Sequence, residues 1–261
     1  MNKKFLSAIL GVTLLFSSVA TLTSCGSSDK NNNENQQSSN TASDNAVGDE
    51  ILGTVESEGL AYVLSKDESY YLVSGMGECK DTRVVIPATY NSRPVLGIAE
   101  GNSQAGAGAF EGCQTLESIV IPDGATTIGA AAFASCRNLK RVSMPNSITF
   151  IEATAFNGCA ALSYNEFENA KYLGNKENPY AVLISAKNKT VTSSTVHTNT
   201  TMIMSKAFTG CTALTSVTFQ NAENWSVNET VLLKTDLENT ATAASYLTGN
   251  YCARIWLRNA L

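Results

Sequence analysis

One five-residue string, Ala-Phe-x-x-Cys, occurs four times in this chain and strongly constrains how the chain can fold. Its phenylalanines are separated by 23, 23 and 52 residues, and stand at Phe110, Phe133, Phe156 and Phe208. The last interval is one period of 23 plus 29 further residues. A fixed period of this length is typical of repeat architectures, in which a unit that cannot bury its own apolar face stacks on its neighbours.

Other apolar positions keep the same register. An isoleucine stands five residues before three of the phenylalanines, at Ile128, Ile151 and Ile203. A leucine stands six residues after each of the four, at Leu116, Leu139, Leu162 and Leu214. An irregular earlier copy begins at Cys79, followed by the apolar run at residues 84–86. Several matched columns together predict a repeat array rather than a coincidence of composition.

Each unit predicts a short strand with alternate residues facing inward, then a turn, then a second inward contact at the isoleucine. Stacked units would place neighbouring strands about 4.8 Å apart in a parallel sheet. We expect the four phenylalanines to form one column on the wall opposite the strands. The repeat cysteines should form a second column, at Cys79, Cys113, Cys136, Cys159 and Cys211.

Two segments depart from the pattern. The third repeat loses its strand signature at residues 162–167, and Glu168 stands where proline would be expected. An insertion at about residues 168–197 then separates it from the last repeat. Within the insertion, residues 180–186 and 190–196 alternate in polarity, which predicts a β-hairpin that continues the sheet or leans on it.

Both ends of a repeat array need caps, because they expose apolar surface and unpaired strand edges. Upstream, residues 59–64 and 69–73 predict a hairpin that pairs with the first coil. Downstream, Asp236 is expected to cap a helix that ends at Gly249. That helix would bury one face, formed by Leu237, Ala241, Ala244 and Leu247. A final strand is expected at residues 251–257, with Trp256 covering the last phenylalanine.

The repeat resembles the BspA-type leucine-rich repeats of bacterial surface proteins, whose unit reads approximately IPxxVTxIGxxAFxxCxxLxxVx. Residues 121–136, IPDGATTIGAAAFASC, show the likeness, which covers about residues 72–219. The resemblance implies a leucine-rich-repeat solenoid of the α/β class. It would be β-rich, with a curved parallel sheet of 23-residue repeats, a hairpin cap at the N-terminal side and a short helical cap at the other. It also implies adhesion to host or neighbouring cells.

The N-terminus resembles a bacterial lipoprotein signal. Residues 1–4 are basic, residues 5–20 are apolar and uncharged, and residues 22–26 read LTSCG. In proteins with this motif the cysteine, here Cys25, receives a lipid and cleavage occurs just before it. An ordinary cleaved signal with an incidental cysteine is the alternative. Residues 26–49 are polar and contain one hydrophobic side chain larger than alanine, which predicts a disordered tether.

These features divide the chain into five parts. We expect a lipoprotein signal peptide at 1–24, a lipidated cysteine and tether at 25–49, a hairpin cap at 50–78, the repeats at 79–219 and a C-terminal cap at 220–261. The protein would be exported and anchored by lipid to the bacterial cell membrane or outer membrane. Its folded part would face outside the cytoplasm, and we expect a monomer.

Few residues suggest catalysis or metal binding. The repeat cysteines follow the fold period without a CxxC pair, so buried free thiols are preferred over disulfides or a metal site. His197 is interpreted as a lone exposed histidine on the insertion hairpin. Glu166, Glu168 and Glu177 would allow a glycosidase, although solvated loop acids explain them more simply. We therefore expect neither an enzyme nor a cofactor or metal. Lys+Arg 18 against Asp+Glu 23, with no basic block, argues against nucleic-acid binding.

The remaining candidate is a surface. Strand alternation directs one set of side chains outward on the sheet face, where repeat proteins commonly bind partners. The candidate partner-binding residues are Arg83, Ser118, Arg141, Ser143, Tyr164, Glu166, Ser216 and Thr218. The favoured hypothesis is a lipid-anchored binding module for an extracellular protein or glycan, with a role in adhesion. A structural envelope lipoprotein that acts as a spacer or assembly part is the alternative, and a hydrolase is a third hypothesis.

Overall fold

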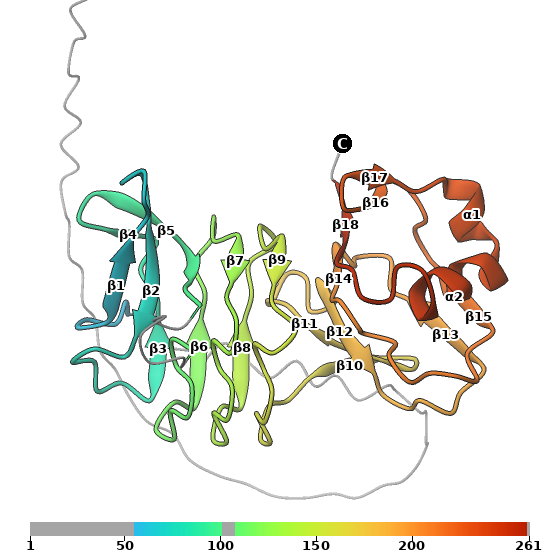
Figure 1. Ribbon diagram of the computed structural model, residues 1–261. Coiled ribbons are helices and arrows are strands. Elements are labelled where there is room, and N and C mark those ends of the chain that lie inside the picture. The colour runs from blue at the N-terminus through green and yellow to red at the C-terminus, as the bar shows by residue number, and fades with distance from the viewer. Residues whose placement is uncertain (1–54, 101–107, 260–261) are drawn as a thin grey trace, which may run out of the picture. The chain divides into compact units, whose positions relative to one another are not determined.

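The computed structural model of the protein describes residues 55–100 and 108–259. The predicted signal, Cys25 and the polar tether therefore lie outside the described residues. Over the described part, short strands occur along the whole chain, and two helices lie near its C-terminal end (Figure 1).

The first described elements form the predicted antiparallel hairpin. β1 (Ala61–Leu64) pairs with β2 (Tyr71–Gly75), and β2 pairs in parallel with β5 (Arg93–Ile98). A short strand, β4 (Thr89–Tyr90), pairs with the beginning of β5. Because β2 occupies an edge of β5 that would otherwise be open, the hairpin caps the first coil.

Successive coils contribute one strand to each of two parallel sheets (Figure 1). One sheet consists of β3 (Arg83–Val85), β6 (Ser118–Val120) and β8 (Arg141–Ser143) in that order. The other continues from β5 through β7 (Thr127–Ile128) to β9 (Phe150–Ile151). Paired residues of β6 and β8, and of β7 and β9, are 23 positions apart. The predicted leucine-rich-repeat solenoid is confirmed.

The phenylalanines of the first three repeats form a stacked column. The ring of Phe133 lies 5.4 Å from that of Phe110 and 5.3 Å from that of Phe156, with interplanar angles of 4° and 9°. All three belong to one hydrophobic cluster. Phe208 belongs to a second cluster, so the expected single column of four is wrong at this residue. The physical reason is an interruption of the array between the third and last strings.

Two of the repeat cysteines link their coil to the one before it. The Cys136 thiol donates a hydrogen bond of 2.9 Å to the carbonyl oxygen of Phe110, and Cys159 donates one of 3.0 Å to Phe133. Every cysteine in the described residues is a free thiol. The interpretation as buried thiols is confirmed for four of the five ladder positions, since Cys113 is only half-buried.

A hairpin interrupts the array after the third string. The chain pairs with the preceding coil at Ser163 and then leaves the sheet as β10 (Asn165–Phe167) and β11 (Ala170–Leu173). It returns at Gly174, which bridges to Ser143, 31 positions earlier rather than 23. This excursion explains why the third repeat lacks the usual strand pattern.

The hairpin predicted between residues 180–186 and 190–196 is wrong. β12 (Val182–Ala186) pairs with β11 and with β14 (Met202–Ile203). β13 (Ser193–Val196) instead pairs in parallel with β15 (Ser216–Phe219), at a constant spacing of 23 residues. The predicted insertion therefore contains a hairpin and a further coil that lacks the Ala-Phe-x-x-Cys string.

The C-terminal strands complete the sheet that contains β14. β18 (Trp256–Arg258) lies between β14 and β16 (Trp225–Val227), and β17 (Thr230–Val231) forms the edge. β18 is shorter than the expected strand at residues 251–257. Trp256 stacks on Phe219, the last phenylalanine of the chain, with ring centroids 6.0 Å apart.

Two short helices replace the single helix expected in this region. α1 (Lys234–Glu238) ends at Asn239, whose side chain caps α2 (Thr240–Thr248) by accepting a hydrogen bond of 3.0 Å from the Thr242 N–H. Gly249 ends α2 as predicted. Neither helix of the described chain has the length and apolar character needed to span a membrane.

Asp236 is not the predicted N-cap. It lies in the first turn of α1, and its carboxylate accepts a hydrogen bond of 2.9 Å from the Tyr246 hydroxyl. The expected buried face is partly correct, with Leu237 and Leu247 buried, but Ala241 is exposed and Ala243 is buried. The chain breaks at Asn239 into two helices, so the residues before and after the break do not share one buried helical face.

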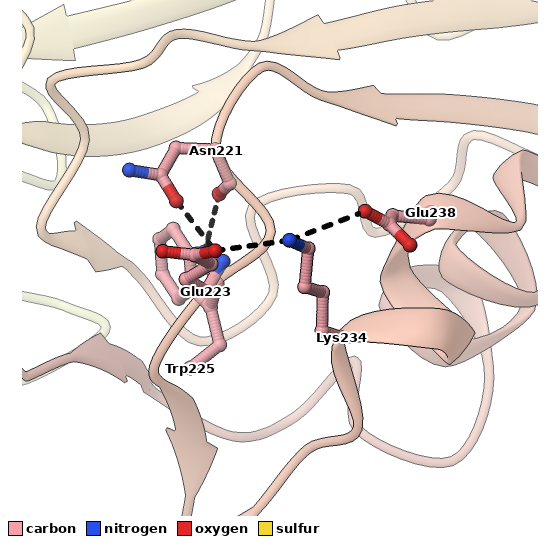
Figure 2. Close-up of polar contacts among 5 residues, drawn as sticks. All are labelled: Asn221, Glu223, Trp225, Lys234 and Glu238. Carbon is pink, nitrogen blue, oxygen red and sulfur yellow. Dashed lines mark hydrogen bonds and ion pairs between the residues drawn. The ribbon is translucent and has the colours of Figure 1, made fainter.

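Polar contacts hold α1 against the loop that precedes β16 (Figure 2). The Lys234 ammonium lies 2.9 Å from Glu223 and 3.6 Å from Glu238. At the end of this loop, the indole N–H of Trp225, the first residue of β16, donates a hydrogen bond of 2.9 Å to the Asn221 carbonyl oxygen. The Trp225 indole is fully buried in the second hydrophobic cluster. Its burial anchors the end of the loop in that cluster.

Candidate partner-binding surface

The three-stranded sheet formed by β3, β6 and β8 presents an ordered row of polar side chains. Its inward residues, Val84, Ile119 and Val142, are buried in the first hydrophobic cluster. Because side chains alternate along a strand, the neighbouring residues of each strand face outward. Arg83 is paired with Ser118, and Ser118 with Arg141, so the serine lies between two arginines in register.

Ser118 is buried although it faces outward. It is 3% exposed, and its hydroxyl has no hydrogen-bond partner among residues 55–100 and 108–259. A hollow of about 20 Å³ lies here. It is lined by Arg83, Glu117, Ser118, Lys140 and Arg141. This space accommodates one oxygen-sized atom, and the buried hydroxyl needs a partner.

The charges around the hollow are unevenly paired. Lys140 lies 3.5 Å from Glu117, so these two side chains largely neutralise one another. Neither Arg83 nor Arg141 forms an ion pair within the part of the chain that the structure describes. The row therefore carries two cations without a carboxylate partner. The next outward row is less polar, and consists of Val85, Val120 and Ser143, all half-buried.

Tyr164 does not extend this face as expected. It packs against the first hydrophobic cluster, and burial raises its pKa to about 12. The Lys171 ammonium lies 5.4 Å from the centroid of its ring, a cation–π contact. The prediction of an outward tyrosine is wrong because the chain leaves the sheet immediately after Ser163.

The other predicted surface residues are divided between separate elements. Glu166 lies on the β10–β11 hairpin and forms an ion pair with Lys187. Ser216 and Thr218 lie on β15, in the two-stranded sheet with β13. The structure thus brings together only four of the eight predicted residues on one sheet: Arg83, Ser118, Arg141 and Ser143.

A groove that the sequence did not predict lies where the array is interrupted. Its volume is about 380 Å³, and its walls come from β9 and from the β16–β18 region. Phe150 is 47% exposed there, opposite Ile255 and Leu257. One feature of the sequence pointed to this groove. Phe150 directly precedes the inward-facing Ile151, so alternation directs a large apolar side chain to the outside of the coil.

His197 is not the exposed residue that was expected. It is half-buried, with its ring 4.2 Å from that of Tyr180 and 4.8 Å from that of Phe167. Its Nδ1 accepts a hydrogen bond of 3.1 Å from the Asn199 N–H, and burial lowers its pKa. His197 packs in this way because it directly follows β13, in the coil that the sequence did not identify as a repeat.

The described residues contain no arrangement suited to metal binding. No three His, Cys, Asp or Glu side chains converge in this part of the chain. Of the acids that allowed a glycosidase, Glu166 is paired with Lys187, and Glu168 lies in the turn between β10 and β11.

Comparison with known families identifies the repeat. Six copies of the BspA type leucine rich repeat region match this chain, over residues 98–177 and 185–250. The chain belongs to the BspA-type leucine-rich-repeat family. The second matched range includes the coil around β13, which agrees with its pairing to β15.

Solved structures of other leucine-rich-repeat proteins resemble the chain. A leucine-rich-repeat protein of T. pallidum is 24% identical, with a TM-score of 0.41, over 61% of this chain and 68% of that one. A leucine-rich-repeat protein of Bacteroides ovatus is also 24% identical, with a TM-score of 0.39, over 61% of this chain and 39% of that one. No curated protein matches. Within this repeat array, the row on the sheet formed by β3, β6 and β8 is the candidate site.

Proposed function

We propose that this protein is a lipid-anchored cell-surface binding module whose BspA-type repeats dock an extracellular protein or glycan, with adhesion as its role. The leucine-rich-repeat fold supports a protein-interaction module in general. The proposal places the docking surface on the sheet formed by β3, β6 and β8. Catalysis is not part of the proposal, because leucine-rich repeats typically serve as binding modules.

The observation that carries the proposal is the row of Arg83, Ser118 and Arg141. Among the residues that the structure describes, the two arginines have no carboxylate partner, and the buried hydroxyl between them makes no hydrogen bond. Arginine is a residue type favoured where proteins bind one another, which supports a binding role for the row. The neighbouring half-buried Val85 and Val120 add apolar surface of the kind found at the centre of interfaces.

The anchoring part of the proposal rests on the sequence. Residues 22–26 provide the lipid-acceptor motif around Cys25, and residues 26–49 provide a polar tether. A tether of 24 residues would span roughly 25–30 Å as a flexible coil, enough to hold the repeats away from a membrane.

Binding is tested with residues 50–261, which contain both hydrophobic clusters and omit the predicted anchor. We expect saturable binding to a member of a panel of matrix proteins, host-cell surfaces and glycans, weakened by Arg141→Ala. Arg137→Ala is the matched control, because Arg137 is exposed on a turn outside the sheet row. Absence of binding across the panel, or equal losses in the two variants, would contradict the proposal.

Anchoring is tested in whole cells by fatty-acid labelling and protease shaving. Wild-type protein should incorporate the label and be shaved, whereas Cys25→Ser should lose the label and be released into the medium. If cross-linking in intact cells captured only envelope components, the structural envelope lipoprotein would replace adhesion as the favoured function.

A further inference from the structure

We propose that the row formed by Arg83, Ser118 and Arg141 is a carboxylate-binding site that receives an aspartate or glutamate side chain of a protein partner. The inference rests on the proposed function and specifies the chemistry of its docking surface. The ligand group is a carboxylate, and its place is the hollow over Ser118, between β3 and β8.

The first step is the unsatisfied hydroxyl. The Ser118 hydroxyl can donate one hydrogen bond and accept others, yet it makes none within the described residues, and the residue is only 3% exposed. The hollow of about 20 Å³ admits one oxygen atom. A carboxylate oxygen placed there would accept a hydrogen bond from the Ser118 hydroxyl and give the buried serine the partner that it lacks.

The second step is the position of the charges. Neighbouring strands of a sheet lie about 4.8 Å apart, so Arg83 and Arg141 approach the hollow from its two sides. A guanidinium presents its N–H donors in a planar fork that fits the two oxygens of a carboxylate. One bound carboxylate would therefore engage Ser118 with one oxygen and a guanidinium with the other, and would offset the repulsion between the two arginines.

The third step separates a polypeptide from a sulfated glycan. Binding to a polyanion requires an extended basic track, but Lys140 is already paired with Glu117, which leaves the two arginines as the cations of the hollow. The row beside them contains Val85 and Val120 rather than further charges. A surface with two cations beside apolar side chains fits an acidic side chain that has an apolar neighbour. A polypeptide supplies such a pair of side chains.

The site itself is tested on the full chain with acetate as the probe. Phenylglyoxal modifies arginine side chains, and mass spectrometry of peptides measures the rate at each arginine. Acetate should slow modification of Arg83 and Arg141 several-fold relative to chloride at equal ionic strength, while Arg137 reacts at an unchanged rate. Equal protection by chloride would overturn the proposal.

Ser118→Ala distinguishes a carboxylate site from a hydroxyl that only holds a water molecule. The variant removes an unpartnered buried polar group, so it should fold and be at least as stable as the wild type. It should abolish the protection by acetate at Arg83 and Arg141. Unchanged protection in this variant would show that the hollow plays no part, and would also overturn the inference.

The partner chemistry is tested by selecting a random heptapeptide library on the full chain and on the Arg83→Ala/Arg141→Ala variant. Selected peptides should contain aspartate or glutamate near an apolar residue, and should lose about tenfold or more in affinity for the double variant. Selection without acidic enrichment, or displacement of the peptides by a sulfated oligosaccharide at lower concentration, would contradict the inference.

The two proposals can fail separately. Surface binding by residues 50–261 that is insensitive to Ser118→Ala would leave the binding module standing and overturn the carboxylate site. Protection by acetate that depends on Ser118, together with no partner in the surface panel, would support the carboxylate site and contradict adhesion.

Discussion

The thiol of Cys136 donates a hydrogen bond of 2.9 Å to the carbonyl oxygen of Phe110, a residue 26 positions earlier. The same carbonyl also accepts a bond of 3.0 Å from the Cys113 N–H within its own turn. One oxygen thus joins a local turn to the next coil. Cys159 repeats this contact with Phe133, so two consecutive coils are joined in the same way.

Replacing Cys136 should therefore weaken the contact between coils. Cys136→Ala removes one of the two donors to the Phe110 carbonyl and leaves a small cavity at a fully buried position. We expect a decrease of about 1–2 kcal/mol in the free energy of unfolding, measured by urea denaturation. Cys113→Ala is the control, because its sulfur is half-buried and its hydrogen-bond contact is with Thr115 in the same turn rather than with another coil. A loss as large in the control would contradict the argument.

The same burial should make the protein sensitive to alkali. Burial, with a smaller contribution from Cys159, raises the pKa of Cys136 to about 12. An unfolded cysteine has a pKa of about 8.5, so the unfolded chain loses this proton first as pH rises. The stabilisation is complete below about pH 8.5 and is lost between there and pH 12.

Urea denaturation at pH 8 and pH 10 measures this effect. The unfolding midpoint of the wild type should fall over this range, and that of Cys136→Ala should fall less. The buried tyrosines contribute mainly above this window, because an unfolded tyrosine titrates near pH 10. Parallel decreases in the two proteins would show that the thiol is not responsible.

The stacked phenylalanines should dominate the stability of the first three repeats. Phe133 is fully buried between Phe110 and Phe156, so Phe133→Ala opens a cavity that neither rigid neighbour can fill. We expect a decrease of about 3–5 kcal/mol in the free energy of unfolding. Phe150→Ala is the matched control, since 47% of Phe150 is exposed and its loss should cost about 1 kcal/mol or less. Similar losses in a denaturation series would contradict the role of stacking.

The period and the phenylalanine column could be predicted from sequence because each regular coil buries the same residue types at the same positions. The coil around β13 could not, because residues 185–189 read SAKNK where the string would stand. In its strand, Ser194 occupies the buried position that corresponds to Val217. Within this strand, only Val196, which pairs with Phe219, keeps an apolar residue at an inward position. One matched position in the strand does not identify a repeat.

The candidate site could be predicted where the strands follow the regular period, and could not where the array is interrupted. Alternation within a strand correctly placed Arg83, Ser118 and Arg141 in one row, because β3, β6 and β8 follow the regular period. It failed at Tyr164, where the chain leaves the sheet for the β10–β11 hairpin. The groove beside β9 could not be predicted, because its walls come from segments that are about 100 residues apart in sequence.

The single histidine of the chain provides a test of the packing around β13. His197 is held among Tyr180 and Phe167, and burial lowers its pKa below the usual 6.5. The unfolded chain therefore takes up a proton at a higher pH than the folded protein. The stabilisation is complete above about pH 6.5 and is lost as pH falls from there toward the folded pKa.

We expect the urea midpoint of the wild type to fall between pH 7.5 and pH 5.5, and that of His197→Asn to fall less. Asparagine lacks a group that titrates in this range, while its side-chain oxygen can replace Nδ1 as the acceptor for the Asn199 N–H. Carboxylates such as Asp67 and Glu152, whose pKa values are lowered by hydrogen bonds from serine and threonine side chains, respond only at lower pH. Equal decreases in the two proteins would mean that His197 is as well solvated in the folded chain as in the unfolded one, which would contradict its packing against Tyr180 and Phe167.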